Sequence, residues 1–108
     1  MAENGKAYVA NKGSNTVSVI DNGNKVGADI TVGSAPWGVA TSDRGYAKGY
    51  VYVSNSNSNS VSVIDTATNT VATTIGLDAA PGDLVVSPDG NLLYVTATDK
   101  VVVIDLLP

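Results

Sequence analysis

The chain of 108 residues contains neither cysteine nor histidine. Without cysteine it can form no disulfide bond, and without histidine it lacks the most frequent general base and the most frequent metal ligand. Ser-His-Asp and Cys-His catalytic sites cannot be assembled from these residues, and neither can a typical zinc site. The composition therefore predicts no enzyme active site, no metal and no cofactor.

Positive charge is also sparse, because six lysines and arginines are scattered among ten acidic residues and the net charge is −4. Binding of nucleic acid needs clustered cations that neutralise phosphates, so we expect no nucleic-acid partner. No apolar run approaches the roughly 20 residues of a membrane-spanning helix. The first five residues are polar and do not resemble a signal peptide.

The chain is rich in Val, Thr, Ser and Asn, with 44% hydrophobic and 15% charged residues. Val and Thr favour strands, whereas Asn, Gly, Asp and Ser favour turns. No segment has a helical apolar stripe. This composition predicts a globular, all-β domain over residues 1–108.

Two motifs recur three times along the chain. A Tyr-Val motif occupies residues 8–11, 52–55 and 94–97, and a Val-x-Val-Ile-Asp motif occupies residues 17–21, 61–65 and 101–105. The copies are spaced by about 40 to 45 residues, which is the length of a propeller blade of four antiparallel strands. We therefore divide the chain into a partial blade at 6–33, a full blade at 36–76 and a partial blade at 81–106.

Alternation and turn residues predict ten strands in these copies. The inner strands are expected at 38–41 and 84–87, and the second strands at 6–10, 50–54 and 92–96. The third strands are expected at 16–20, 60–64 and 101–104, and the outer strands at 29–32 and 70–75. Ser87-Pro88-Asp89-Gly90 suits a hairpin turn between the first two strands of its copy.

The repeated segments resemble the YVTN family of β-propeller repeats, with Ser-Pro-Asp-Gly, Tyr-Val-Ser-Asn and Asn-Ser-Val-Ser-Val-Ile-Asp standing in the family's order. The match runs from Ala7 to Asp105. Tyr46-Ala47-Lys48 is an insertion, and the third copy has a shortened hairpin at Thr98-Asp99-Lys100. The resemblance implies propeller blades and an extracellular or cell-surface scaffold.

Ten strands do not close a ring, which typically needs four to eight blades. Both ends of the array leave strand edges that can recruit another chain. We predict a homo-oligomer or a filament that forms by edge pairing. The residues of this candidate assembly edge are Val101, Val102, Val103, Ile104 and Tyr8.

A second candidate site lies on the loops that, in a propeller, gather on one face. Trp37 stands where an outer strand leads into the next inner strand, and it can pack between blades or stack on a sugar or peptide. The candidate ligand face comprises Lys12, Asn15, Trp37, Asn57 and Asp78. Tyr46, Tyr50 and Arg44 are a further candidate contact patch, aromatic and cationic, on the opposite face.

Three functions remain open from the sequence. The first is a non-catalytic repeat scaffold for self-assembly or for contact with a protein or glycan. The second is part of a larger propeller enzyme whose catalytic residues lie in other blades. The third is an engineered repeat protein. The repeated Asp21, Asp65 and Asp105 fall on separate blades, so we expect them to stabilise turns rather than to share a metal.

Overall fold

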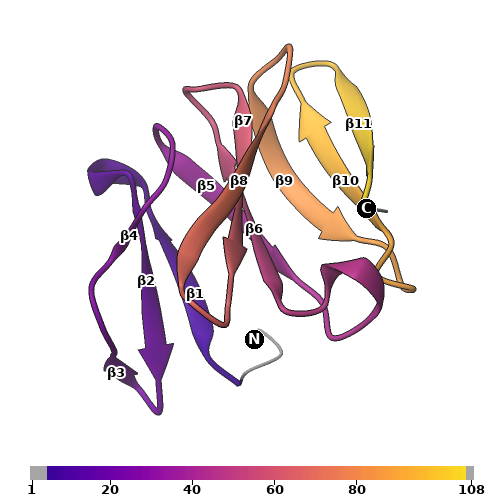
Figure 1. The fold of residues 1–108 in the computed structure, drawn as a ribbon. Helices are drawn as coiled ribbons and strands as arrows, with labels where there is room; N and C mark the ends of the chain where they lie inside the picture. Colours follow the sequence, from indigo (N-terminus) through magenta and orange to yellow (C-terminus); the bar gives the residue numbers. More distant parts are fainter. Residues whose placement is uncertain (1–4, 107–108) are drawn as a thin grey trace.

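The structure is a computed structural model that describes residues 5–106. It consists of three antiparallel sheets that stand side by side (Figure 1). Blade 1 contains β1 (Ala7–Asn11), β2 (Thr16–Asp21), β3 (Asn24–Lys25) and β4 (Ile30–Thr31). Blade 2 contains β5 (Pro36–Thr41), β6 (Tyr50–Asn55), β7 (Ser60–Asp65) and β8 (Thr70–Gly76). Blade 3 contains β9 (Pro81–Val86), β10 (Leu92–Ala97) and β11 (Lys100–Asp105).

The predicted all-β class with antiparallel blades is confirmed. Two short 3-10 helices, η1 (Lys12–Ser14) and η2 (Gly45–Ala47), interrupt the connections. Between residues 5 and 106 there is no helix with the length and apolar character that a membrane crossing requires.

Residues that tolerate left-handed backbone conformations close the hairpins. Asn22 and Gly23 both have positive φ and join β2 to β3 as a two-residue turn, which matches the right-handed twist of the strands. In the Ser87–Gly90 turn, the Gly90 N–H donates to the Ser87 carbonyl at 2.9 Å, and Gly90 has a φ of 77°. The hairpin turn that the sequence predicted at 87–90 is therefore present.

The outer strand of blade 1 departs from the expected segment 29–32. It is split into β3 and β4, which both pair with β2, so the described residues contain eleven strands instead of the expected ten. The break contains Gly27, whose φ of 71° is incompatible with an extended strand. The tight Asn22-Gly23 turn also starts this strand earlier than the sequence predicted.

Side chains alternate between the two faces of each sheet. We call the face that points toward the next blade in the chain the forward face and the opposite one the rear face. The forward face of blade 1 packs on the rear face of blade 2 around Tyr8, Val19 and Ile64. The forward face of blade 2 packs on the rear face of blade 3 around Tyr52, Leu93 and Val95. The core is therefore two layers between three blades.

The inserted segment contributes to the second layer. Tyr46 and Ala47 belong to η2, and Ala47 is fully buried. The Ala47 N–H donates to the Gly90 carbonyl at 2.8 Å. The insertion therefore packs against the Ser87–Gly90 turn of blade 3.

Candidate functional site

The loops of the candidate ligand face are joined by hydrogen bonds. Asn15 has a φ of 58°, and its Oδ1 accepts from the Ala35 N–H at 3.0 Å. The Asn57 N–H donates to the Ser34 carbonyl at 3.1 Å. The connection from β4 to β5 is thus held by the hairpin loops of blades 1 and 2.

Trp37 is the most exposed aromatic side chain of this face, at 58%. The Lys12 Nζ lies 4.9 Å from the centroid of its ring, within the range of a cation–π interaction. The side chain is therefore not packed between blades, which was one of the two alternatives for it. Lys12 and Trp37 form the one direct contact that the structure shows among the five predicted residues.

Asp78 is engaged elsewhere on the loops. Its carboxylate oxygens accept from Lys100 Nζ at 2.8 and 2.9 Å. This hydrogen bond and the charge of Lys100 hold the pKa of Asp78 below its ordinary value. Asp78 therefore joins the loops of blades 2 and 3 rather than the pair of Lys12 and Trp37.

The residues of the candidate assembly edge point in different directions. Val101 and Val103 are exposed, whereas Val102 and Ile104 are half-buried against blade 2. Tyr8 is buried, and its hydroxyl donates to Asn69 Oδ1 at 2.7 Å. The exposed residues of the candidate assembly edge therefore lie on the forward face of blade 3.

Blades 2 and 3 have the same register, which allows a comparison of their forward faces. Ala40, Tyr52 and Val63 lie in one cross-strand row, and Val85, Tyr94 and Val103 form the same row in blade 3. Val63 is 7% exposed in blade 2, whereas Val103 is 57% exposed. Four apolar side chains therefore stand exposed where blade 2 buries its own; they are Val85, Tyr94, Val101 and Val103.

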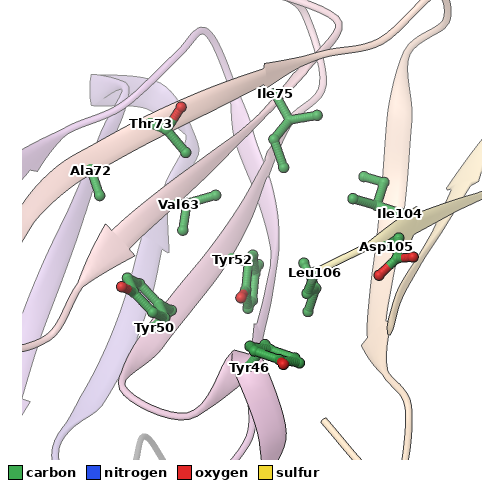
Figure 2. Close-up of a pocket in the computed structure, with 10 residues that line it drawn as sticks. All are labelled: Tyr46, Tyr50, Tyr52, Val63, Ala72, Thr73, Ile75, Ile104, Asp105 and Leu106. Carbon is green, nitrogen blue, oxygen red and sulfur yellow. The ribbon is translucent and has the colours of Figure 1, made fainter. Parts of the chain in front are cut away.

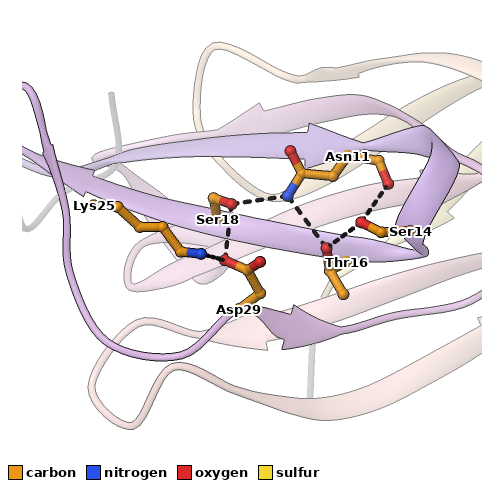
Figure 3. A network of polar contacts seen from close by, with 6 residues as sticks. All are labelled: Asn11, Ser14, Thr16, Ser18, Lys25 and Asp29. Atoms are coloured by element: carbon orange, nitrogen blue, oxygen red, sulfur yellow. Dashed lines mark hydrogen bonds and ion pairs between the residues drawn. The ribbon is translucent and has the colours of Figure 1, made fainter.

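The rear face of blade 1 carries a network of polar contacts instead (Figure 3). The Asn11 Nδ2 donates to Thr16 Oγ1 at 3.2 Å and to Ser18 Oγ at 2.8 Å. The Ser18 hydroxyl donates to Asp29 Oδ1, which also pairs with Lys25 Nζ at 3.0 Å. The hydrogen bonds from Lys25 and Ser18 hold the pKa of Asp29 below its ordinary value. The two free faces of the array thus differ in chemistry.

A groove of about 400 Å³ lies between β8 and the end of β11 (Figure 2). Tyr46, Tyr50 and Tyr52 gather at one end of it. Its walls are formed by residues of β7, β8 and the end of blade 3, namely Val63, Ala72, Thr73, Ile75, Ile104, Asp105 and Leu106. Burial raises the pKa of Tyr52 to about 12, and the neighbouring Tyr50 adds to the effect.

This groove was not predicted from the sequence. Tyr46 and Tyr50 line it, whereas Arg44, the third residue of the predicted patch, is not among the lining residues and pairs with Asp43, with Nε 3.9 Å from Oδ1. The groove depends on how blade 3 packs on blade 2. The available signal was the equivalence of Tyr8 and Tyr52 in the repeat.

Asp65 and Asp89 stabilise turns. Asp65 Oδ1 accepts from the Ala67 N–H at 2.9 Å, as expected for a turn. Asp89 Oδ1 accepts from the Ser87 hydroxyl and the Asn91 N–H, and these bonds lower the pKa of Asp89. Within the described range 5–106, no three acidic side chains gather as a metal site would require.

Comparison with solved structures identifies the architecture, although no family model and no curated protein matches the sequence. The hydrazine synthase of Kuenenia stuttgartiensis superposes with a TM-score of 0.87 at 25% identity, over 97% of this chain and 31% of that chain. A functionally unknown protein from Desulfotomaculum acetoxidans gives 0.82 at 26% identity, over 96% of this chain and 35% of that chain. The blades are β-propeller blades. This chain spans about one third of the length of these two structures.

The glutaminyl cyclase of Myxococcus xanthus also superposes, with a TM-score of 0.62 at 17% identity. The match covers 94% of this chain and 53% of that chain. This likeness concerns the fold alone. The same arrangement of blades therefore occurs as a part of several longer chains.

Proposed function

We propose that this chain is a non-catalytic β-propeller scaffold that self-associates through the forward face of blade 3. The observation that carries the proposal is the exposure of Val85, Tyr94, Val101 and Val103 at the register positions that blade 2 buries. A contiguous apolar patch on a soluble domain is typical of an interaction surface. The absence of histidine and cysteine supports the non-catalytic part of the proposal.

A second copy of the same face is the partner that fits best. The alternative surface within the chain is the rear face of blade 1, which carries the ion pair of Lys25 and Asp29. Packing apolar side chains on that face would remove charged groups from water without a new partner. An isologous dimer, in which two blade 3 faces meet, avoids this cost.

The apolar area that the dimer would bury sets a bound on the free energy of association. Covering a side chain such as Val101 or Val103 contributes roughly 1 to 2 kcal/mol, at about 25 cal/mol per Å² of apolar surface. Association costs translational and rotational freedom, which offsets part of this gain. We therefore expect a dimer that forms in the micromolar range and not a permanent assembly.

The experiment is sedimentation velocity of the whole chain over a concentration series. The wild type should shift from monomer to dimer, and Val103→Lys should weaken this association at least tenfold. Val9→Lys is the matched control, because Val9 is an exposed valine on the rear face of blade 1. A monodisperse monomer at every concentration would overturn self-association and would favour a piece of a longer propeller.

The contact of Lys12 with Trp37 supports a second candidate function, the binding of a glycan or peptide. An exposed tryptophan ring that is held in place by a cation–π contact offers a stacking surface for a sugar or a peptide group. Titration of Trp37 fluorescence with oligosaccharides tests this function, since Trp37 is the only tryptophan. The YVTN-type resemblance supports a place for such a scaffold at the cell surface.

A further inference from the structure

The interface between blades 1 and 2 shows how a groove of this type is filled. The residues that enter it belong to the turn before β8 and to its first residues. Asn69 accepts a hydrogen bond from the Tyr8 hydroxyl at 2.7 Å. Val71 packs against the apolar cluster that contains Tyr8, Val19 and Ile64. One short segment therefore supplies both a polar and an apolar contact.

The groove between blades 2 and 3 has equivalent residues at two positions of its wall but lacks that segment. Tyr52 stands at the position of Tyr8 in the repeat, and Val63 stands at the position of Val19. Both residues line the groove, as Figure 2 shows. Within residues 5–106, no hydrogen bond of the Tyr52 hydroxyl is formed, although its side chain is only 3% exposed.

The backbone of β11, beside the groove, also resembles that of β7. β7 pairs with β6 on one side and with β8 on the other. Its counterpart β11 pairs with β10 only, among the strands that the structure describes. The Leu106 N–H donates to the Asn91 carbonyl at 3.0 Å, just as the Thr66 N–H donates to the Gly49 carbonyl at 3.0 Å. β11 is therefore held on β10 in the same register in which β7 is held on β6.

We infer that this groove is a binding site for a single extended β-strand from outside residues 5–106, and that it accepts such a strand as a free peptide. The strand pairs antiparallel with β11 and extends the sheet of blade 3, which is a recurrent mode of peptide recognition. It places an amide side chain against the Tyr52 hydroxyl and, two residues later, a β-branched apolar side chain beside Val63 and Ile104. This site lies on the rear side of blade 3 and does not rest on the proposed dimer.

The occupant must be a lone strand and not the β11 of a second copy. In each copy, Val102 and Ile104 already pack toward the copy's own blade 2. The same side chains cannot also enter the groove of a neighbour. A strand outside any sheet has both faces free and avoids this conflict. The chemistry of the partner is thus an extended segment with an amide, any residue, and then Val, Ile or Thr.

The test uses a fluorescein-labelled peptide with the sequence of residues 69–76, Asn-Thr-Val-Ala-Thr-Thr-Ile-Gly, added to the whole chain. Fluorescence anisotropy should show saturable binding. The protein variant Tyr52→Phe should weaken binding about fivefold to tenfold, because it removes only the hydroxyl. Replacing the peptide's asparagine by alanine should weaken binding of the wild type similarly and add nothing to Tyr52→Phe.

Tyr8→Phe is the matched control, since it removes the same hydroxyl from the interface that is already filled. Peptide affinity should then be unchanged. Amide hydrogen exchange should show new protection in β11 and none in β1. Absence of binding, an affinity that Tyr52→Phe does not change, or protection at β1 would each overturn the strand site. None of these readouts depends on the dimer, because all can be measured in the Val103→Lys variant.

Discussion

Gly33 lies directly against the side chain of Asn55. A Cβ atom on Gly33 would stand 2.7 Å from Asn55 Cγ and 2.6 Å from Ser58 Oγ. Gly33 belongs to the connection between blades 1 and 2, and Asn55 ends β6 in a fully buried position. The two blades therefore approach each other here at a distance that only glycine allows.

The first prediction is that Gly33→Ala destabilises the chain by about 2 kcal/mol, because overpacking of a close contact typically costs about 1 to 3 kcal/mol. Gly76→Ala is the control, since a Cβ there would meet nothing within 4 Å. Its effect should stay within about 0.5 kcal/mol. Urea denaturation of both variants measures the difference. Equal losses would mean that the contact with Asn55 is not the cause.

The second prediction compares two asparagines with the same local bonds. The Asn55 Nδ2 donates to Ser60 and Ser62, as the Asn11 Nδ2 donates to Thr16 and Ser18. Asn55 is buried by blade 1, whereas Asn11 lies on a free face. Asn55→Ala should cost about 2 to 3 kcal/mol and Asn11→Ala less than about 1 kcal/mol, as buried polar partners lose more. Similar values in denaturation curves would contradict the role of burial.

The third prediction separates steric overlap from backbone strain. Gly90 and Gly23 have nearly equal positive φ values, 77° and 79°. A Cβ on Gly90 would overlap the Arg44 carbonyl, whereas one on Gly23 would meet nothing within 4 Å. Gly23→Ala should cost about 1 to 2 kcal/mol from strain alone. Gly90→Ala should lower the stability clearly more than Gly23→Ala does. Thermal unfolding of both variants measures the difference. Equal losses would mean that backbone strain alone is responsible.

The fourth prediction concerns alkaline pH. Burial raises the pKa of Tyr52 from 10.0 to about 12, so the folded chain holds this proton more tightly than the unfolded chain does. The resulting stabilisation is complete below pH 10 and is lost as pH rises through 12. A shift of two pKa units corresponds to at most about 3 kcal/mol, and solvent in the groove beside Tyr52 screens part of it.

Denaturation curves between pH 8 and pH 12 measure this loss. In Tyr52→Phe the free energy of unfolding should fall less steeply above pH 10 than in the wild type. Tyr46→Phe removes an exposed phenol and serves as the control. If Tyr52→Phe follows the wild-type curve, another group carries the alkaline loss.

Much of the fold was predictable because the repeat imposes a register. The expected segments 50–54, 60–64 and 92–96 lie within β6, β7 and β10. The inner strand β5 begins two residues before the expected 38–41, because Pro36 pairs with Asn55 across a register shift. Such an irregularity leaves no pattern in the sequence. β3 was missed because two residues are too few to alternate.

The candidate site was less predictable. Loop order placed Lys12 and Trp37 on one face, but their contact depends on rotamers that the sequence does not specify. Val85 and Val103 are exposed because, within residues 5–106, no blade packs on the forward face of blade 3, and no strand pattern in the sequence marks this difference. The groove at Tyr52 combines residues from three elements, and no local motif marks it.

The hydrogen bond from Tyr8 to Asn69 spans 61 positions of the chain. The hairpins of blade 1 can form from neighbouring residues as soon as they leave the ribosome. The apolar cluster on its forward face, however, includes Val53, Ile64 and Val71 from blade 2. The forward face of blade 1 therefore stays uncovered during synthesis until β8 has been made. We expect the chain to fold blade by blade, with folding about one blade behind translation.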